Sequence, residues 1–193
     1  MRLNVQHLRK SLPTDDPDKL EDFTQSMISQ IDTLGGIAEA FSRFANMPEL
    51  KSEKFPAREI IERVTALYPG YDIQFDCEDP EAIIFGDKDQ LVRVMNNLIN
   101  NSIQAIPKDR EAVLKVRMAR VRDELQISLS DNGTGIPQEQ GDKIFEPRFT
   151  TKSGGMGLGL AMVKNIIDSF KGSIWYESAP QKGTTFYISL PLA

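Results

Sequence analysis

Histidine and cysteine each occur only once in this 193-residue sequence, as His7 and Cys77. A catalytic triad, a histidine-rich zinc site or a Cys/His zinc finger would each need partners for His7 that the sequence does not contain. The single cysteine excludes an internal disulfide, and with it the class of small secreted proteins that disulfides staple together. These two counts remove several kinds of enzyme centre and favour a reducing compartment.

Long apolar runs and an excess of positive charge are also missing. No run approaches the roughly 18 to 20 apolar residues that span a bilayer, and the first residues have no apolar signal-peptide core. The 23 basic and 28 acidic residues give a formal net charge of −5, so the basic footprint of a nucleic-acid-binding protein is absent. We therefore expect a soluble, cytoplasmic chain without a nucleic-acid partner.

The composition and one polar stretch indicate how the chain is organised. With 40% hydrophobic and 26% charged residues, the sequence is typical of a globular protein rather than a disordered or collagen-like one. Residues 48–55 are polar and bounded by Pro48 and Pro56, which is typical of a linker. We expect an appendage over residues 1–47 and one domain over residues 56–193.

Residues 1–47 have the pattern of a helical hairpin. Asp16 and Pro17 form a favourable start for a helix of about 30 residues, and residues 1–12 fit the end of a preceding helix. An ordinary amphipathic pair and half of an intermolecular bundle both fit this pattern. Two rows of side chains repeat every seven residues along the longer helix: Leu20, Met27, Leu34 and Phe41, and Phe23, Gln30, Ile37 and Phe44.

Residues 56–193 alternate between helical and strand periodicity. The strand patterns are mostly joined as hairpins, and several alternate apolar with polar side chains. The fold class is therefore α/β (α+β), a two-layer sandwich in which helices cover one face of a mixed sheet. We expect helices near 57–67, 87–106 and 157–170, and strands near 72–75, 82–85, 113–121, 124–130, 173–177 and 184–190.

The helix over 87–106 carries an unusual polar stripe, formed by Arg93, Asn97, Asn101 and Gln104. Asparagine is a mediocre helix former, so several of them in mid-helix cost stability that lysine or glutamate would not. A solvated face that is rich in asparagine is one interpretation. The other is that neutral amide oxygens face a hard cation, such as magnesium bound together with phosphate.

Two glycine-containing segments follow. Asp131-Asn132-Gly133-Thr134-Gly135-Ile136 ends an alternating strand, where a carboxylate can accept a hydrogen bond from an exocyclic amine, although Asp-Asn-Gly is also a routine turn. Gly154-Gly155-Met156-Gly157-Leu158-Gly159-Leu160 opens a helix and follows Thr150-Thr151-Lys152. Peptide N–H groups at such a turn form an anion site, and Lys152 adds a positive charge beside it. The spacing matches neither a Walker A loop nor a Rossmann fingerprint.

Together and in this order, these motifs resemble those of the Bergerat-fold ATPases, and most closely those of the sensor histidine kinases. Asn97–Ser102 resembles their N box, Asp131–Ile136 their G1 box, Ile144–Lys152 their F box and Gly155–Leu160 their G2 box. Gly183–Phe186 resembles the terminal strand, so the resemblance covers about residues 55–193.

The resemblance implies a site for ATP and Mg²⁺. Asp131 would accept from the adenine amino group with Thr184 nearby, Asn101 would hold the magnesium, and Lys152 would neutralise the terminal phosphate. Residues 138–156 would form a mobile lid. The implied catalytic residues are Asn97, Asn101 and Lys152, and the implied binding residues are Asn97, Asn101, Asp131, Gly133, Gly135, Ile136, Thr150, Thr151, Lys152, Gly155, Gly157, Leu158, Gly159, Leu160 and Thr184.

Asn97 and two departures from the family pattern, at Gln104 and Arg148, bear on the reaction. Hydrolytic relatives carry a glutamate where Asn97 stands, and its absence favours transfer to a protein over hydrolysis. Gln104 stands where many kinases have a lysine, and Arg148 replaces an aromatic residue of the F box, so Lys152 or Arg148 would supply the missing charge near phosphate.

The hairpin is also similar to that family, since Phe41–Pro48 resembles nitrogen-regulation kinases of the NtrY type. It would be the distal part of a dimerisation and phosphotransfer hairpin. In such kinases the phosphoacceptor lies in a His-Glu-x-x-Asn-Pro motif, which His7-Leu8-Arg9 does not match. The resemblance thus implies a chain that begins after its phosphoacceptor, a homodimer through the hairpin, and any membrane attachment through upstream segments.

The resulting hypothesis is the ATP-binding catalytic region of a sensor histidine kinase. It would transfer the γ-phosphate to a histidine outside this chain, for relay to an aspartate of a response regulator receiver domain. Two alternatives remain: a Bergerat-fold serine kinase of the anti-sigma-factor type, which the long hairpin disfavours, and a nucleotide-dependent interaction module without turnover.

Overall fold

The structure is a computed structural model that describes residues 51–147, 149 and 157–193. The predicted hairpin over residues 1–47 lies outside this part, so the division into hairpin, linker and domain stays a prediction. The same holds for several residues of the predicted site and for part of the predicted lid, residues 148 and 150–156. Outside the described residues are Arg148, Thr150, Thr151, Lys152 and Gly155.

The described residues form a five-stranded mixed sheet with the order β2-β4-β5-β7-β6, and a two-stranded sheet of β1 and β3. β2 runs parallel to β4, and the other neighbours in the larger sheet are antiparallel. The strands are β1 (Glu53–Pro56), β2 (Asp72–Cys77), β3 (Ile83–Gly86), β4 (Val113–Val121), β5 (Glu124–Asp131), β6 (Ser173–Ala179) and β7 (Gly183–Pro191). The helices are α3 (Ala57–Thr65), α4 (Lys88–Ala105), α5 (Gly159–Ser169) and the 3₁₀ segment η1 (Gln138–Phe145).

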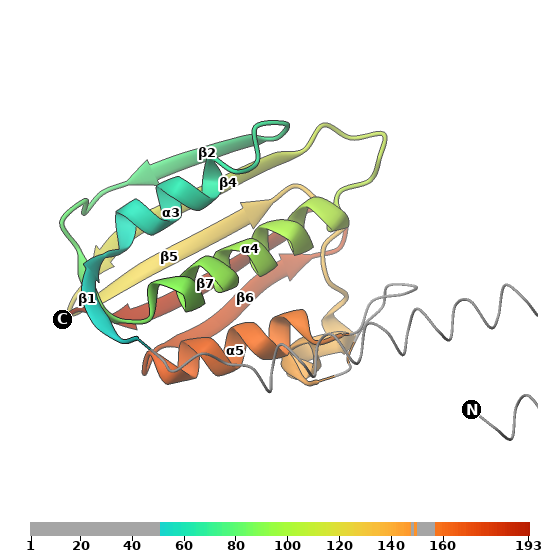
Figure 1. Cartoon of the computed structure of the whole chain (residues 1–193). Coiled ribbons are helices and arrows are strands. Elements are labelled where there is room, and N and C mark those ends of the chain that lie inside the picture. The colour runs from blue at the N-terminus through green and yellow to red at the C-terminus, as the bar shows by residue number, and fades with distance from the viewer. Residues whose placement is uncertain (1–50, 148, 150–156) are drawn as a thin grey trace, which may run out of the picture. The chain divides into compact units, whose positions relative to one another are not determined.

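The three α-helices of the described residues lie on the same face of the large sheet (Figure 1). The reason is visible in the strand pattern, because the apolar residues of β4, β5 and β7 alternate toward the helices while polar residues face away. The core fills the space between the two layers. Its largest fully buried side chains include Leu91, Met95 and Leu98 of α4, Leu114 and Met118 of β4, and Leu125, Ile127 and Leu129 of β5. The predicted fold class is therefore confirmed.

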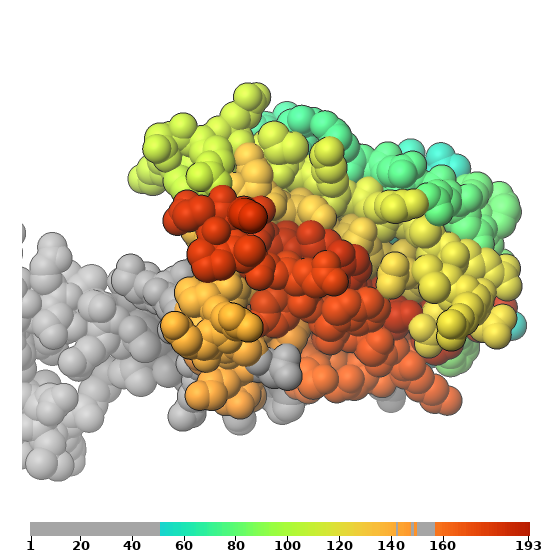
Figure 2. Space-filling model, turned by 180° about the vertical axis from the view of Figure 1, so that it is seen from behind, coloured from blue at the N-terminus to red at the C-terminus, as the bar shows by residue number. Residues whose placement is uncertain are grey.

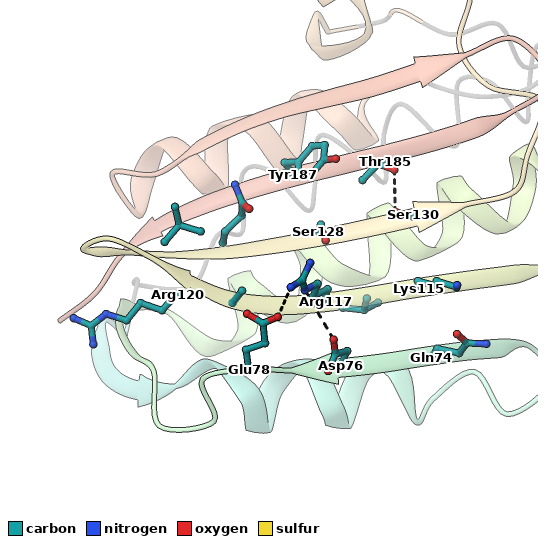
Figure 3. A pocket seen from close by; sticks show the side chains of 14 residues that line it. Gln74, Asp76, Glu78, Lys115, Arg117, Arg120, Ser128, Ser130, Thr185 and Tyr187 are labelled. Carbon is teal, nitrogen blue, oxygen red and sulfur yellow. Dashed lines mark hydrogen bonds and ion pairs between the residues drawn. The ribbon is translucent and has the colours of Figure 1, made fainter.

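The opposite face of the sheet is seen from behind in Figure 2, where side chains of β4, β5 and β7 lie directly at the surface. A shallow hollow of about 640 Å³ lies on this face (Figure 3). Three of its charged groups form ion pairs: Arg117 contacts Glu78 and lies 3.9 Å from Asp76. The charged and hydroxyl groups of this face can be hydrated, so the face needs no covering helix.

β1 is the strand that the sequence pattern missed, since residues 53–55 were predicted to end a linker. Glu53 and Lys54 are exposed, but Phe55 is buried with 1% of its surface accessible. β1 pairs antiparallel with β3, and Ile84 of β3 bridges to Leu192 at the end of the chain. The strand therefore depends on partners distant in sequence, which local composition cannot reveal.

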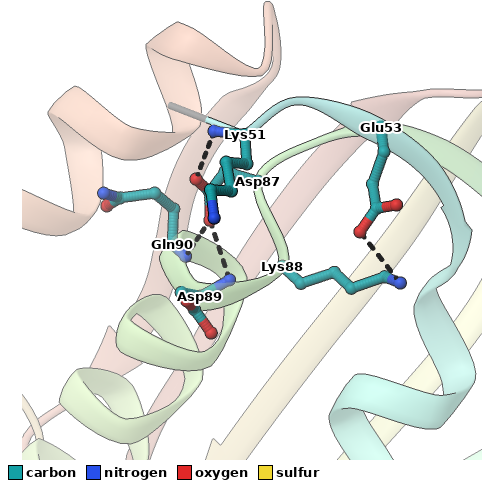
Figure 4. A network of polar contacts seen from close by, with 6 residues as sticks. All are labelled: Lys51, Glu53, Asp87, Lys88, Asp89 and Gln90. Carbon is teal, nitrogen blue, oxygen red and sulfur yellow. Dashed lines mark hydrogen bonds and ion pairs between the residues drawn. The ribbon is translucent and has the colours of Figure 1, made fainter. Parts of the chain in front are cut away.

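Helix α4 begins at a strong N-cap. Oδ1 of Asp87 accepts hydrogen bonds from the backbone N–H groups of Asp89 and Gln90, at 2.9 and 3.2 Å. Oδ2 of Asp87 accepts from the backbone N–H of Lys51 at 2.9 Å, so one carboxylate ties the start of the described chain to the helix (Figure 4).

We expect Asp87→Ala to lower the free energy of unfolding by about 1–2 kcal/mol, because it leaves the amides of the first helical turn without their acceptor. Chemical denaturation followed by circular dichroism measures this. Asp89→Ala is the matched control, since the exposed Asp89 carboxylate caps no amide and contributes only through the helix dipole. Equal losses in the two variants would contradict the role of the cap.

No helix in the described ranges is both long and apolar enough to cross a lipid bilayer.

Candidate functional site

Asp131 is a buried carboxylate at the C-terminal end of β5, with 9% of its surface accessible. Its Oδ1 accepts two backbone hydrogen bonds, from Gly133 at 2.9 Å and from Thr184 of the neighbouring β7 at 3.2 Å. Among the described residues nothing donates to Oδ2. The side chain is therefore held firmly through one oxygen while the other stays available as an acceptor for a ligand.

The C-terminal end of α4 lies against the loop that follows Asp131. The backbone N–H of Thr134 donates to the carbonyl of Ala105 at 3.0 Å. A side chain on Gly133 would place its Cβ 2.8 Å from that carbonyl and 2.9 Å from Oδ1 of Asp131. Glycine at this position therefore lets the loop close onto the helix and onto the carboxylate at the same time.

The four asparagines of α4 divide into two pairs with different surroundings. Tyr68 holds the first pair: its hydroxyl donates to Oδ1 of Asn96 at 2.9 Å and accepts from Nδ2 of Asn100 at 3.1 Å. Burial raises the pKa of Tyr68, and the hydrogen bond from Asn100 opposes that rise, so the phenol keeps its proton for Asn96 at neutral pH. These two asparagines thus have a structural role.

The second pair, Asn97 and Asn101, lies toward α5. A methyl group on Gly159 would lie 3.1 Å from Oδ1 of Asn97 and 3.8 Å from Nδ2 of Asn101. Nδ2 of Asn97 donates to the carbonyl of Arg93 at 2.8 Å, which turns its oxygen toward the start of α5. Glycine at position 159 therefore leaves room for the Asn97 side chain, which a Cβ would force to shift by a few tenths of an ångström.

The N-terminus of α5 is not capped by any side chain of the described residues, in contrast to that of α4. Gly157 has φ +61° and Leu158 occupies the cap position, while the first turn carries no acidic residue. Backbone N–H groups of a first helical turn that have no acceptor attract anions. This end of α5 therefore combines backbone amides that no described side chain caps with the oxygen of Asn97.

The structure thus brings most of the described predicted residues together along α4. Asn101 and Asn97 precede Ala105 by one and two helical turns, so the two ends of the site lie about 6 to 12 Å apart along the axis. Gly135 packs under the β6–β7 turn, since a Cβ there would lie 2.2 Å from the carbonyl of Ala179. Ile136 donates its backbone N–H to Ser178 at 2.7 Å. Gly157, Leu158 and Leu160 are each half-buried at the start of α5.

Two hydroxyls of this region were given no role from the sequence, although Ser102 ends the predicted N box. Ser102 of α4 lies one turn before Ala105 and is 1% exposed. Its Oγ has no hydrogen-bond partner among the described residues. A buried hydroxyl without a partner is a group that a ligand can satisfy. Ser178 of β6 is the second, and it contacts both Ile136 and Thr184. The sequence signal that could have indicated them is a polar residue at an inward-facing position of α4 and of β6.

This combination of fold and site defines a class of ATPase. Residues 86–193 match the family described as histidine kinase-, DNA gyrase B- and HSP90-like ATPase, and the chain belongs to that family. The resemblance predicted from the four boxes is thereby confirmed.

The relatives include several sensor kinases. Nitrogen regulation protein NtrY of Azorhizobium caulinodans is 32% identical over 205 residues, covering 100% of this chain and 26% of that protein. Sensor histidine kinase ZraS of Escherichia coli is 41% identical over 120 residues, covering 62% of this chain and 25% of that protein. Sporulation kinase B of Bacillus subtilis is 30% identical over 175 residues, covering 88% and 41%. The chain therefore spans between about a quarter and two fifths of the length of these relatives.

Solved structures agree with the family. The catalytic domain of histidine kinase ThkA superimposes with a TM-score of 0.67 at 29% identity, covering 74% of this chain and 98% of that domain. The mycobacterial sensor histidine kinase MprB gives a TM-score of 0.63 at 27% identity, covering 72% and 97%.

Proposed function

We propose that this chain is the ATP-binding catalytic region of a two-component sensor histidine kinase, which transfers the γ-phosphate of ATP to a histidine outside this chain. The observation that carries the proposal is that the two ends of the site, spaced along α4, differ in chemistry. An acceptor, Asp131, lies beside the C-terminal end of the helix, and Asn97, Asn101 and the uncapped start of α5 lie near its middle. The adenine base of ATP matches the acceptor end, and its phosphate chain matches the end with the uncapped helix start.

At the base end, Asp131 accepts from the exocyclic amine of adenine through Oδ2. Its Oδ1 is already occupied by the amides of Gly133 and Thr184, which fixes the direction in which Oδ2 points. At the phosphate end, amides of Gly157 and Gly159 donate to phosphate oxygens, as the uncapped N-terminus of α5 permits. Gly133, Gly135, Ile136, Leu158, Leu160 and Thr184 complete the described part of the binding set.

Mg²⁺ fits the same end of the site. It is a hard cation that is bound by oxygen ligands and substrate phosphates and keeps several waters. Asn101 provides an amide one turn from Asn97 and beside the start of α5, so it is the residue that would hold the ion. The ion would neutralise charge on the phosphates, and Thr150, Thr151, Lys152 and Gly155 would act with it from the predicted lid.

The site favours transfer over hydrolysis. At the position of Asn97 a carboxylate would activate water, whereas an amide cannot accept a proton. Nδ2 of Asn97 donates to the carbonyl of Arg93, so its Oδ1 faces the phosphate region as an acceptor or a metal ligand. The acceptor of the phosphoryl group must then be a nucleophile brought in by another segment.

Partners follow from the same function. A structure of ThkA in complex with the response regulator protein TrrA is known, and we propose a receiver domain as the partner of this chain as well. ShkA, which shares this fold, was solved in complex with AMPPNP. We further propose a homodimer through the hairpin of residues 1–47 and a cytoplasmic location.

The test is incubation of this chain with γ-labelled ATP and Mg²⁺, alone and with a helical hairpin that bears a His-Glu-x-x-Asn-Pro motif. We expect acid-labile label on the histidine of the added hairpin. Label on serine would replace the proposal by a serine kinase, and binding of ATP without transfer would replace it by an interaction module without turnover.

A further inference from the structure

Ser178 is a polar residue in a row of otherwise apolar ones. The inward positions of β6 are Ile174, Tyr176 and Ser178, and their partners on β7 are Ile188, Phe186 and Thr184. The first two cross-strand pairs pack against the core, and the third pair consists of two hydroxyls beside Asp131. Apolar packing alone does not require two hydroxyls at the inner end of a sheet.

Three hydrogen bonds converge on the Ser178 hydroxyl. The backbone N–H of Ile136 donates to its Oγ at 2.7 Å, the hydroxyl donates to the carbonyl of Gly183 at 3.0 Å, and it lies 2.9 Å from Oγ1 of Thr184. A serine hydroxyl has a single proton. Because that proton is given to the carbonyl of Gly183, the proton of the bond between the two hydroxyls comes from Thr184.

The direction of this bond decides what Thr184 offers to a ligand. Once Thr184 donates to Ser178, its oxygen can act only as an acceptor. Oδ2 of the adjacent Asp131 is an acceptor too, and the two residues are linked by the amide of Thr184, which donates to Oδ1 at 3.2 Å. Oγ1 of Thr184 and Oδ2 of Asp131 are then two acceptors on neighbouring strands. Such a pair suits an amino group, which has two hydrogens to donate.

We propose that Ser178 is a positioning residue for purine selection: by taking the proton of Thr184 it makes the site accept a C6 amino group and reject a C6 carbonyl oxygen. This inference rests on the proposed function, because it assumes that a purine nucleotide binds beside Asp131. Ser178 also holds the backbone of Ile136 and so links the base-binding loop to the β6–β7 turn.

The substitution that tests this is Ser178→Ala, measured as the dissociation constants of ATP and of inosine triphosphate, which carries a carbonyl oxygen at C6. Without the Ser178 oxygen, the hydroxyl of Thr184 is free to rotate and to donate to a carbonyl oxygen. We expect the preference for ATP over inosine triphosphate to fall about tenfold, and Ser178→Thr, which keeps a hydroxyl, to restore it.

Ser130→Ala is the matched control. Ser130 and Thr185 form the same kind of hydroxyl pair, at 2.8 Å, across neighbouring strands on the helix-free face of the sheet (Figure 3). Its loss removes an equivalent hydrogen bond without changing what faces the purine. The nucleotide preference of this variant should equal that of the parent protein.

A second variant examines the mechanism from the other partner. Thr184→Val is close in shape, keeps the amide that donates to Asp131, and removes the hydroxyl whose direction is in question. It should lower the preference for ATP, and Ser178→Ala added to it should cause no further change, because Ser178 acts through Thr184.

The outcomes are separable. An unchanged preference in Ser178→Ala or in Thr184→Val overturns the inference, and the latter variant decides the matter if the former does not fold. If Asp131→Asn weakens ATP binding while both hydroxyl variants keep the full preference, only this inference fails. If Asp131→Asn binds ATP as tightly as the parent protein, the assignment of the base to this site fails as well.

Discussion

The Asp131→Asn variant should bind ATP about 10- to 100-fold more weakly than the parent protein. Oδ1 of Asp131 accepts from the amides of Gly133 and Thr184, so the amide oxygen of an asparagine must take this place. Its NH₂ group then points where Oδ2 stood and confronts the amino group of adenine, donor against donor. A hydrogen bond to a charged group contributes about 1.5–3 kcal/mol, and each 1.4 kcal/mol is a factor of ten in affinity.

Isothermal titration calorimetry with ATP and Mg²⁺ measures this loss, and thermal unfolding verifies that the variant is folded. Asp168→Asn is the matched control because it removes an exposed carboxylate near the end of α5 whose ion pair is with Lys164 on the same helix. Such a pair contributes little to stability. Tight ATP binding by the folded Asp131→Asn variant would remove the adenine assignment.

The second large effect concerns the fold at the same point. Gly183 begins β7 with φ +86°, and a Cβ there would lie 1.9 Å from the backbone carbonyl oxygen of Asp131. Alanine at this position meets both the cost of left-handed backbone, about 1–2 kcal/mol, and a clash with main chain that cannot move without displacing β5. We expect Gly183→Ala to lower the free energy of unfolding by about 3–5 kcal/mol, a loss reserved for strain and overpacking.

Two other glycines separate these contributions. Gly141 has φ +45°, but a Cβ at this position would meet only open space, so Gly141→Ala should show the cost of backbone conformation alone. Gly70 has neither a positive φ nor an atom within 4 Å, so Gly70→Ala should be near neutral. The denaturation midpoint should therefore be lowest for Gly183→Ala, intermediate for Gly141→Ala and highest for Gly70→Ala. A Gly183→Ala variant no less stable than Gly141→Ala would show that the contact with Asp131 is not a constraint.

Most helices and strands of the described domain could be predicted because each has its own periodicity. The inward positions of β5 and β7 alternate without interruption, and α4 repeats its apolar side chains at helical spacing up to Ile99. β1 could not be predicted, because of its four residues only Phe55 is fully buried, and it is a strand only through its pairing with β3. Local pattern carries no information about a partner about 30 residues away.

The site was predicted through order rather than through any one motif. The asparagines of α4, Asp131 with its glycines and the glycine-rich start of α5 each had an ordinary explanation, and their succession along the chain indicated a nucleotide site. The family match over residues 86–193 confirms that resemblance. The roles of individual residues, above all those on either side of Gly157, stay predictions that the experiments above address.

The sequence by itself determined the class of this protein, because alternation, helix periodicity and the spacing of four boxes are local properties. Only the tertiary structure decided which polar groups share a task. Tyr68 forms hydrogen bonds with Asn96 and Asn100, which gives these two asparagines a structural role. Asn97 and Asn101 lie beside Gly159 at the start of α5. Pairing of β6 with β7 places Ser178 within hydrogen-bond distance of Thr184 and Ile136. Hydrogen bonds between distant segments form only where folding has brought donors and acceptors within about 3 Å, and spacing along the chain does not encode that distance.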